Sequence, residues 1–344
     1  MESINDFFQG KTILITGGLG SIGEAIVTEL LKLNPAQIRV LDNRETELFY
    51  ARKKLSHHDH IRFFHGDVRE KERLIRAMQG VDIVYHAAAL KHVLSSEYDP
   101  FEAIKTNVLG TQNVIEAAMF NNVHKVILIS TDKAVNPCSV MGTTKLLAER
   151  LISSMAYHRG RSETKFGAVR FGNVLDSRGS VLEIWKKQLL NEEPIHLTDP
   201  EMTRFFMTIP ESVKLIFYAT LLAEEGETFI FKMNSVKMQD LAEVFLEFNH
   251  KDASHHTIIG KATGERMHEK LFFEEENEFI LENDNLFVRL PIITQADNYY
   301  EKFYEKGFFK SDPQETLFSK HSKILLDKDG IRNMFGSILN EPLD

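Results

Sequence analysis

The sequence predicts an α/β protein with a doubly wound parallel sheet and a smaller, mixed α/β domain. Two observations predict this fold: short apolar runs alternate with helix-like segments through the first half, and a glycine-rich turn follows the first run. Regular alternation of this kind favours right-handed crossovers between parallel strands. The alternation ends near Gly172, so we assign residues 1–172 to one domain and 173–344 to a second, leaving open whether a helix of the second returns to the first.

The apolar runs are predicted as strands, and the segments between them carry the helical spacing of apolar residues. The predicted strands are Thr12–Thr16, Ile38–Leu41, Ile61–Phe64, Ile83–His86, Lys125–Ser130 and Phe166–Arg170. The predicted helices are Glu24–Leu33, Glu70–Met78, Ala103–Ala118 and Gly142–Ala156. In the second half, prolines interrupt the pattern, and we interpret the acidic run Glu274–Glu278 as a solvated helix face.

The composition is that of a globular protein rather than a disordered chain. Of 344 residues, 43% are hydrophobic and 26% charged, and 41 Lys and Arg against 50 Asp and Glu give a net charge of −9. That acidity argues against a nucleic-acid partner. No apolar stretch reaches the roughly 20 residues of a membrane span, and the single cysteine, Cys138, excludes an intrachain disulfide and a Cys-rich zinc site. We therefore expect a cytoplasmic protein without a membrane partner.

A dinucleotide-binding turn is predicted directly after the first strand. The apolar run leads into Gly17, Gly20, Ser21, Ile22 and Gly23. Such glycines permit a tight turn, a close approach of pyrophosphate and close helix packing, and the free N–H groups of the helix N-terminus attract phosphate. Asp42 closes the second strand about 20 residues later, where a carboxylate binds the adenosine ribose. The first domain is therefore predicted to be Rossmann-like and to bind NAD, while Arg44 leaves NADP open.

A second group of polar residues follows the strand that ends at Ser130. Thr131, Asp132 and Lys133 lie where doubly wound folds hold their chemistry, at the carboxyl edge of the sheet. A short loop then leads to the segment Met141–Lys145, which opens the next helix. We expect these residues to form the catalytic segment.

These segments resemble the extended short-chain dehydrogenase/reductase superfamily. The resemblance rests on the G-x-x-G-x-x-G spacing and on three further segments in the superfamily's order, Gly66–Val68, His86–Ala89 and Thr106–Val108. It implies additional cofactor-binding residues, namely Asp67, Val68, Ala87, Ala88 and Asn107. The superfamily's oxidising pair is a Tyr followed four residues later by a Lys, whereas here Met141 precedes Lys145.

The chain more specifically resembles the UDP-N-acetylglucosamine 4,6-dehydratases of polysaccharide and glycan biosynthesis, over about residues 10–290. Their TDKA-type segment is followed by NP and then by Y/M-G-x-[TS]-K, and one branch of the group has Met where others have Tyr. Further matching segments are Ala89–Val93, Arg170–Val174, Ser177–Val181, Met202–Phe206 and Gly264–Glu269.

The resemblance implies an internal redox reaction on a nucleotide sugar. Hydride passes from C4 to NAD, water is lost across C5 and C6, and hydride returns to C6. We expect Lys133 to be the C5 base, with a pKa lowered by Lys145, and Asp132 to be the acid at O6. Thr131 would hydrogen-bond O4, and Lys145 would hold the nicotinamide ribose. Because the thioether of Met141 accepts no proton usefully at neutral pH, we expect Asp132 or Lys133 to deprotonate O4 through Thr131 or a water.

Residues of the second domain and its border are expected to bind the nucleotide sugar, whose diphosphate needs nearby cations. The candidates are Arg204 and Asn173, then Lys91 and Arg178, with Ser180, Val181 and, for the nucleotide ribose, Glu265 or Glu269. Members of the resembled group carry R-P-G-E where this chain has Ala262–Glu265. An expected phosphate-binding Arg is thus missing, and we expect Lys261 or Arg266 to compensate.

Two other functions stay open on the sequence. A nucleotide-sugar 4-epimerase shares the C4 oxidation but needs no elimination pair, so Asp132–Lys133 argues against it. A catalytically inactive NAD-binding scaffold is supported by Met141 and opposed by the two lysines. The clustered histidines have no acidic or Cys companions, so we expect no metal. The apolar faces of Ala103–Ala118 and Gly142–Ala156 predict a homodimer or a higher homo-oligomer.

Overall fold

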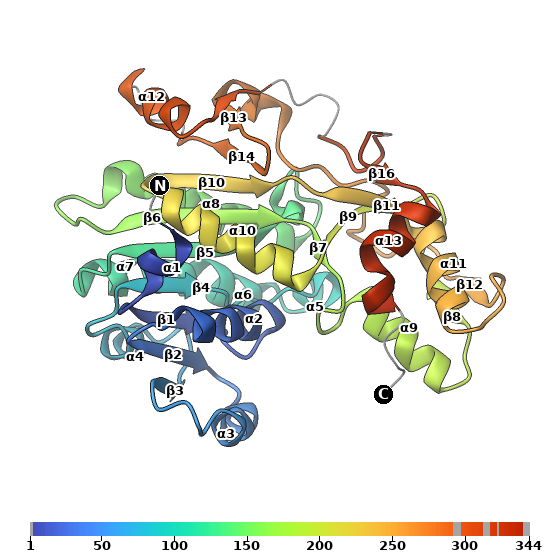
Figure 1. Cartoon of the computed structure of the whole chain (residues 1–344), viewed down its shortest axis with the longest axis horizontal. Coiled ribbons are helices and arrows are strands. Elements are labelled where there is room, and N and C mark those ends of the chain that lie inside the picture. The colour runs from blue at the N-terminus through green and yellow to red at the C-terminus, as the bar shows by residue number, and fades with distance from the viewer. Residues whose placement is uncertain (1–2, 292–296, 312–316, 322, 340–344) are drawn as a thin grey trace.

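The computed structural model describes residues 3–291, 297–311, 317–321 and 323–339, and within them the largest element is a ten-stranded sheet (Figure 1). Its strand order is β15-β13-β14-β10-β6-β5-β4-β1-β2-β3. The strands are β1 (Thr12–Thr16), β2 (Gln37–Asp42), β3 (Ile61–His65), β4 (Ile83–His86), β5 (Lys125–Thr131), β6 (Lys165–Phe171), β10 (Glu225–Phe231), β13 (Ile280–Glu282), β14 (Leu286–Arg289) and β15 (Phe309–Lys310). The six predicted strands are confirmed, two of them with the predicted ends and four with ends that differ by one residue.

The pairing is parallel from β3 across to β10, and β14 then joins β10 in the antiparallel sense. The order 3-2-1-4-5-6 is that of a doubly wound Rossmann sheet, with β10 added beside β6. In this order β2 and β3 are added on one side of β1, and β4 to β6 on the other. The crevice for a ligand opens at this switch point between β1 and β4, at the carboxyl ends of the strands. The predicted fold class is confirmed.

Helices cover both faces of the large sheet because its strands are apolar on both sides. On β1, Ile13 and Ile15 pack in one core and Leu14 in the other. The first face carries α1 (Ile4–Phe8), α2 (Ser21–Leu30), η1 (Leu31–Leu33) and α10 (Ile209–Leu222). The second carries α4 (Lys71–Ala77), α7 (Gly110–Phe120) and α8 (Val140–His158). Helix α10 lies beyond residue 172, so the second half of the chain does return to the first.

Helix boundaries depart from the predictions at identifiable points. The predicted helix Ala103–Ala118 is divided into α6 (Pro100–Ala103), a π-helical turn η2 (Ile104–Leu109) and α7. Two further helices, α3 (Glu45–Lys54) and α5 (Val93–Tyr98), carry no apolar stripe in sequence, since each buries one residue only. Helix α3 follows β2 near the β3 edge of the sheet, whereas α5 packs on α6 and α8 and lines the cavity at the carboxyl ends of the strands.

A smaller unit packs beside the carboxyl edge of the sheet (Figure 1). Its strands are β7 (Asn173–Val174), β9 (Thr203–Met207), β11 (Asn234–Lys237) and β16 (Leu325–Leu326) in one sheet, and β8 (Ile195–Leu197) and β12 (His256–Ile258) in another. Helices α9 (Val181–Leu190), α11 (Met238–Phe248) and α13 (Lys328–Leu339) enclose a core around Trp185 and Phe245. The described residues beyond 172 therefore contribute both to this unit and to the large sheet.

A buried charge cluster joins α8 to the second half of the chain. Arg170 on β6 is fully buried and pairs with Glu149 of α8 at 2.6 Å and with Glu276 at 3.3 Å. Glu276 belongs to the 3-10 helix η4 (Glu274–Phe279) and also contacts Arg150 and Arg289. The interpretation of Glu274–Glu278 as a solvated face is thus wrong at Glu276, because the guanidinium groups that neutralise it come from distant segments.

We expect Arg170→Met to lower the free energy of unfolding by about 3–5 kcal/mol, because it leaves buried Glu149 without its cation and removes one of the three guanidinium groups around buried Glu276. Arg332→Met is the matched control, since Arg332 makes its ion pairs with Glu247 and Asp329 at the surface. Denaturant unfolding of both variants measures the difference. Equal stability of the two would show that the buried cluster adds nothing beyond packing.

Candidate functional site

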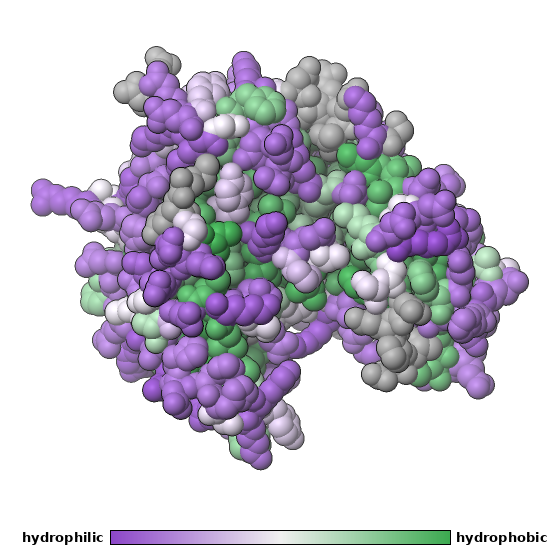
Figure 2. Space-filling model, viewed as in Figure 1, coloured by the Kyte–Doolittle hydropathy of each residue, from purple (hydrophilic) through white to green (hydrophobic). Residues whose placement is uncertain are grey.

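The large sheet and the smaller unit enclose a cavity of about 1330 Å³ at the carboxyl ends of the strands. Figure 2 shows the surface indented between the two units on one face. Apart from Asp132, Asn107 and Lys261, every predicted site residue lines this cavity: Gly17, Gly20, Ser21, Ile22, Gly23, Asp42, Arg44, Asp67, Val68, Ala87, Ala88, Lys91, Thr131, Lys133, Met141, Lys145, Asn173, Arg178, Ser180, Val181, Arg204, Glu265, Arg266 and Glu269. The sequence motifs therefore meet in one place.

The glycine-rich turn is shaped for a close approach to a dinucleotide. A Cβ on Gly17, whose φ is +63°, would lie 2.6 Å from the backbone of Ala88, and one on Gly23 would lie 2.3 Å from the Gly17 carbonyl oxygen. No side chain fits at either position. Gly20 precedes α2 and makes no side-chain cap, so the first N–H groups of the helix face the cavity unpaired by a side chain. These features fit a pyrophosphate at the helix N-terminus.

Asp42 stands at the end of β2, where the adenosine ribose of a dinucleotide is expected. It is 5% exposed and accepts a hydrogen bond from the Leu19 N–H at 3.1 Å. Arg44 donates to both carboxylate oxygens at 3.0 Å, and this fork raises the pKa of its guanidinium. The pair presents both a carboxylate for a ribose hydroxyl and a guanidinium for a 2′-phosphate.

Asn107 lies behind the cavity wall, so its predicted contact with cofactor is corrected. It is 2% exposed. Its carbonyl oxygen accepts from the Leu90 N–H, and its amide donates to the Leu90 carbonyl and to Thr144. Asn107 therefore holds the segment after β4 against α8, and its side chain does not face the cavity.

Arg178 crosses from the segment before α9 to the glycine-rich turn. Its backbone N–H donates to Ser21 Oγ at 2.9 Å, and its guanidinium donates to the Leu19 carbonyl at 2.5 Å and pairs with Glu24. Lys91 in turn donates to the Arg178 carbonyl. In this arrangement Arg178 is held at the cofactor side of the cavity, away from Arg204.

The catalytic segment turns sharply at the end of β5. Thr131 closes the strand, and residues Asp132–Ala134 form the short helix η3. The Thr131 hydroxyl donates to Asp132 Oδ1 at 3.0 Å. Gly142 brings α8 against this turn, since a Cβ there would lie 2.3 Å from the Lys133 carbonyl oxygen. The turn and the helix N-terminus are thus packed as one rigid element.

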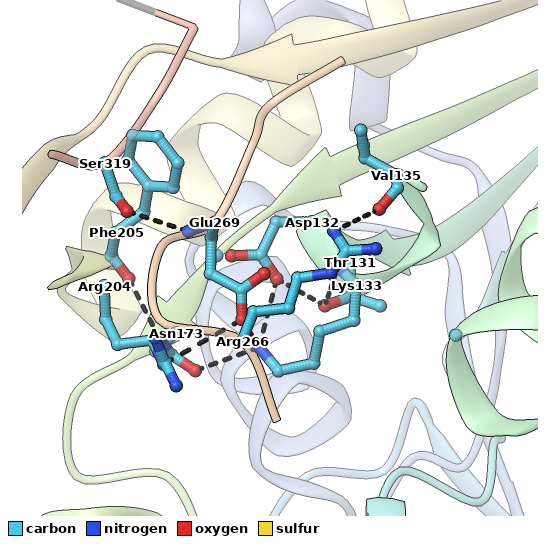
Figure 3. A network of polar contacts seen from close by, with 12 residues as sticks. Thr131, Asp132, Lys133, Val135, Asn173, Arg204, Phe205, Arg266, Glu269 and Ser319 are labelled. Carbon is cyan, nitrogen blue, oxygen red and sulfur yellow. Dashed lines mark hydrogen bonds and ion pairs between the residues drawn. The ribbon is translucent and has the colours of Figure 1, made fainter. Parts of the chain in front are cut away.

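Lys133 carries the positive charge of the catalytic segment. Its Nζ lies 3.1 Å from Asp132 Oδ1 and 3.9 Å from Glu269 Oε1, and it donates to Asn173 at 3.3 Å (Figure 3). Burial lowers the pKa of Lys133, but the charges of Asp132 and Glu269 outweigh it and the pKa is raised. The expectation of a lysine with a lowered pKa is therefore wrong here, because two carboxylates, one of them distant in sequence, surround the ammonium group.

Of Lys133 and Lys145, it is Lys145 whose pKa is lowered. It is buried beneath the cavity and donates to the Ile129 carbonyl at 2.6 Å. Burial lowers its pKa to about 8, although Glu149, one helical turn further on, acts in the opposite direction. Burial, and to a smaller extent the charge of Lys145, lowers the pKa of His86 to about 3, so His86 is neutral at physiological pH.

Two carboxylates occupy different positions around Lys133. Asp132 is fully buried, does not line the cavity, and its Oδ2 lies beside Gly172, where a Cβ would come within 3.0 Å. Glu269 is 3% exposed but lines the cavity, with Arg204 Nε 3.8 Å from its Oε1. Glu269 thus lies at the catalytic segment, a position that its predicted contact with the nucleotide ribose did not anticipate.

Arg266 attaches the segment that carries Glu269 to the catalytic turn. Its guanidinium donates to the Val135 carbonyl at 2.6 Å, and it lines the cavity, whereas Lys261 is exposed. The sequence signal for Arg266 was the missing Arg of the R-P-G-E pattern. Ile184 of α9 and Leu197 of β8 also line the cavity. The sequence could not identify them as site residues, because apolar residues at a site have the same pattern as apolar residues of a core. Among the described residues, no group of His, Cys, Asp and Glu is arranged to hold a metal ion.

Comparison with known proteins agrees with this geometry. The family model described as polysaccharide biosynthesis protein matches residues 13–290. The chain belongs to this family. Relatives include an uncharacterized membrane protein of Methanocaldococcus jannaschii, 53% identical over 84% of this chain and 89% of the relative. In the described part of this chain, no helix combines the length and apolar character that a membrane crossing requires.

Relatives with named activities fall into two classes. A UDP-N-acetylglucosamine 4,6-dehydratase (inverting) of Campylobacter jejuni is 39% identical over 84% of this chain and 86% of its own. A UDP-glucose 4-epimerase of Rickettsia typhi is also 39% identical, over 87% and 88%. The X-ray structure of Pen from Bacillus thuringiensis has a TM-score of 0.87 and 37% identity, covering 97% of this chain and 100% of that chain. The chain is thus a member of a nucleotide-sugar dehydratase and epimerase family.

The Asp42–Arg44 pair generates a prediction about dinucleotide choice. We expect Arg44→Ala to weaken NADP binding about tenfold, because a charge-assisted hydrogen bond to the 2′-phosphate is lost. NAD binding should stay equal or tighten, since Asp42 is released. Arg52→Ala, further along α3, is the control. Titration of each variant with both dinucleotides measures the ratio, and an equal loss for both would mean that Arg44 has only a structural role.

Proposed function

We propose that this protein is an NAD-dependent 4,6-dehydratase that converts UDP-N-acetylglucosamine to the 4-keto-6-deoxy sugar nucleotide for surface glycan biosynthesis. The observation that carries the proposal is the set of proton-transfer groups around Lys133, beside a glycine-rich turn in one cavity. Elimination of water needs a base and an acid in addition to the oxidising centre. A cavity that held only a C4 oxidation site would not need carboxylates on both sides of a lysine.

NAD is the cofactor that fits the first half of the cavity. The unfilled turn at Gly17, Gly20 and Gly23, the start of α2 and the carboxylate of Asp42 would hold its pyrophosphate and adenosine ribose. Lys145, the lysine with a pKa of about 8, would hold the nicotinamide ribose. When bound, NAD accepts hydride from C4 and returns it to C6.

The catalytic turn supplies a proton path from the sugar O4. The Thr131 hydroxyl lines the cavity and donates to Asp132 Oδ1, so a proton leaving O4 for Thr131 can displace the Thr131 proton onto Asp132. Asp132 in turn holds Lys133. This relay supplies the deprotonation that a Tyr at position 141 would perform. Met141 is 2% exposed and packs against the same wall.

The second candidate is a nucleotide-sugar 4-epimerase, favoured by the epimerase names among the relatives at 39% identity. It would use the same C4 oxidation and return hydride to C4. The groups around Lys133 favour the dehydratase because an epimerase removes no water.

The deciding experiment is incubation of the purified protein with NAD and UDP-N-acetylglucosamine, followed by mass spectrometry. We expect a product lighter by one water, and none with Lys133→Met. A product of unchanged mass and altered C4 configuration would establish the epimerase instead. If neither UDP-N-acetylglucosamine nor a related nucleotide sugar reacts or binds, the enzyme reading fails and the inactive scaffold is left.

Replacing Met141 tests the proton path. We expect Met141→Tyr to give no gain in turnover or a loss, because the relay through Thr131 already serves O4 and the larger ring must enter a packed wall. A thermal denaturation curve confirms that the variant is folded, and steady-state rates compare it with the wild type. A large gain would show instead that Met141 only fills the place of a missing base.

The proposed enzyme is a homodimer or a higher homo-oligomer. Large apolar side chains are exposed on α5, α6, η2 and α8, including Tyr98, Phe101, Ile104 and Leu147. These elements contact one another along one side of the molecule. Exposed apolar surface on adjoining helices is typical of a subunit contact.

A further inference from the structure

We propose that Glu269 is the acid of the elimination and also the group that takes the proton from Lys133, so that Lys133 can act as the C5 base. This inference rests on the proposed dehydratase function and deepens it. It replaces two expectations from the sequence, Asp132 as the acid at O6 and Glu269 as a ribose ligand.

The position of the two carboxylates is the first argument. An acid for the sugar O6 must reach the substrate. Asp132 is fully buried outside the cavity wall, with Oδ1 contacted by Thr131 and Lys133, while Oδ2, which like Glu269 Oε2 has no hydrogen-bond partner among the described residues, lies against Gly172. Glu269 lines the cavity on the side facing Lys133 (Figure 3). Only Glu269 of the two therefore has access to the substrate's leaving group.

The second argument is that one carboxylate oxygen of Glu269 accepts no hydrogen bond from the described residues. Its Oε2 is buried and has no hydrogen-bond partner among the described residues, while Oε1 faces Lys133 and Arg204 at 3.9 and 3.8 Å. A buried carboxylate oxygen without a donor is costly. Protonation of Glu269, or a hydroxyl of the substrate, relieves that cost. The backbone is fixed, since the Glu269 N–H donates to Ser319 Oγ at 2.9 Å.

The electrostatics agree with this geometry. Burial raises the pKa of Glu269, and the net shift stays upward although Lys133 and Arg204 oppose it. Two ionisable groups at this separation share their protons as a pair. In the open cavity the proton lies on Lys133, whose pKa is raised. When substrate excludes water, a neutral amine and a neutral carboxyl become more favourable than two charges in a low-dielectric site.

The elimination step then balances within the pair. Transfer of one proton from Lys133 Nζ to Glu269 gives a neutral amine and a carboxylic acid. The C5–H bond breaks with its proton passing to Nζ, and the electron pair forms the C5–C6 double bond. The C6–O6 bond breaks as Glu269 gives its proton to O6, and water leaves. After elimination Lys133 is an ammonium and Glu269 a carboxylate, as at the start. When hydride returns to C6, Lys133 gives its proton back to C5, and the proton that Asp132 took from O4 through Thr131 passes to Lys133 and restores the ammonium.

The test compares Glu269→Gln with Glu269→Asp and with the control Glu274→Gln, an exposed glutamate paired with Lys270. With NAD and UDP-N-acetylglucosamine, we expect Glu269→Gln to lose water formation by about 100-fold or more, the usual effect of losing an acid–base group. Reduced nicotinamide should accumulate, because C4 oxidation continues while elimination stops. Glu269→Asp should recover part of the rate, and Glu274→Gln should match the wild type.

The other outcomes overturn the proposal in different ways. A Glu269→Gln enzyme that eliminates water within about twofold of the wild type would show that Glu269 has no catalytic role. Loss of C4 oxidation together with elimination, in a variant that still binds NAD and unfolds at the wild-type temperature, would assign Glu269 to substrate binding. A variant that no longer folds, together with an inactive Glu269→Asp, would assign it to structure. If the wild type itself forms no dehydrated product, the proposed function fails first and this inference with it.

Discussion

The ammonium group of Lys133 is the charge on which the candidate site depends. Its side chain is 28% exposed, and the ammonium group lies beside two carboxylates, one from each half of the chain: Asp132 at the end of β5 and Glu269 from the segment that follows β12. The second half of the chain therefore contributes a charged group to the candidate catalytic site as well as covering the NAD-binding part of the cavity. Arg266 holds the edge of this half to the catalytic turn, Arg204 lies beside Glu269, and these residues line one side of the cavity.

The sheet could be predicted from the sequence because its signals are local. An apolar run of a few residues, such as Ile83–His86, is a buried strand whatever surrounds it, and Gly17, Gly20 and Gly23 have a local steric meaning. The extent of the sheet could not be predicted. Strand β10 adds to β6 after more than fifty intervening residues, and nothing between residues 172 and 224 indicates which edge it will join. Helix α3 was missed since only Leu48 of its residues is buried.

The site divides in the same way. Asp132, Asn107 and Lys261 were predicted to be at the site and do not line the cavity, whereas the other predicted site residues do. The charge states were not predictable, because they depend on partners that the sequence does not bring together. Lys145 lies twelve residues from Lys133 in sequence. Burial lowers the pKa of Lys145, whereas the charges of Asp132 and Glu269 raise the pKa of Lys133 against the effect of burial. Glu276 shows the same limit in the core, where its cations come from α8, β6 and β14.

Arg178 has a consequence for how long the dinucleotide stays bound. Its segment lies over the glycine-rich turn and contacts Leu19, Ser21, Glu24 and Lys91, so these contacts would oppose the departure of a dinucleotide on this side of the turn. An enzyme that exchanges its oxidised and reduced dinucleotide at every turnover would be slowed by such contacts. A reaction that restores its own hydride acceptor has no such exchange step. For the proposed reaction, these contacts would suit a dinucleotide that stays bound from one cycle to the next while the sugar nucleotide enters and departs.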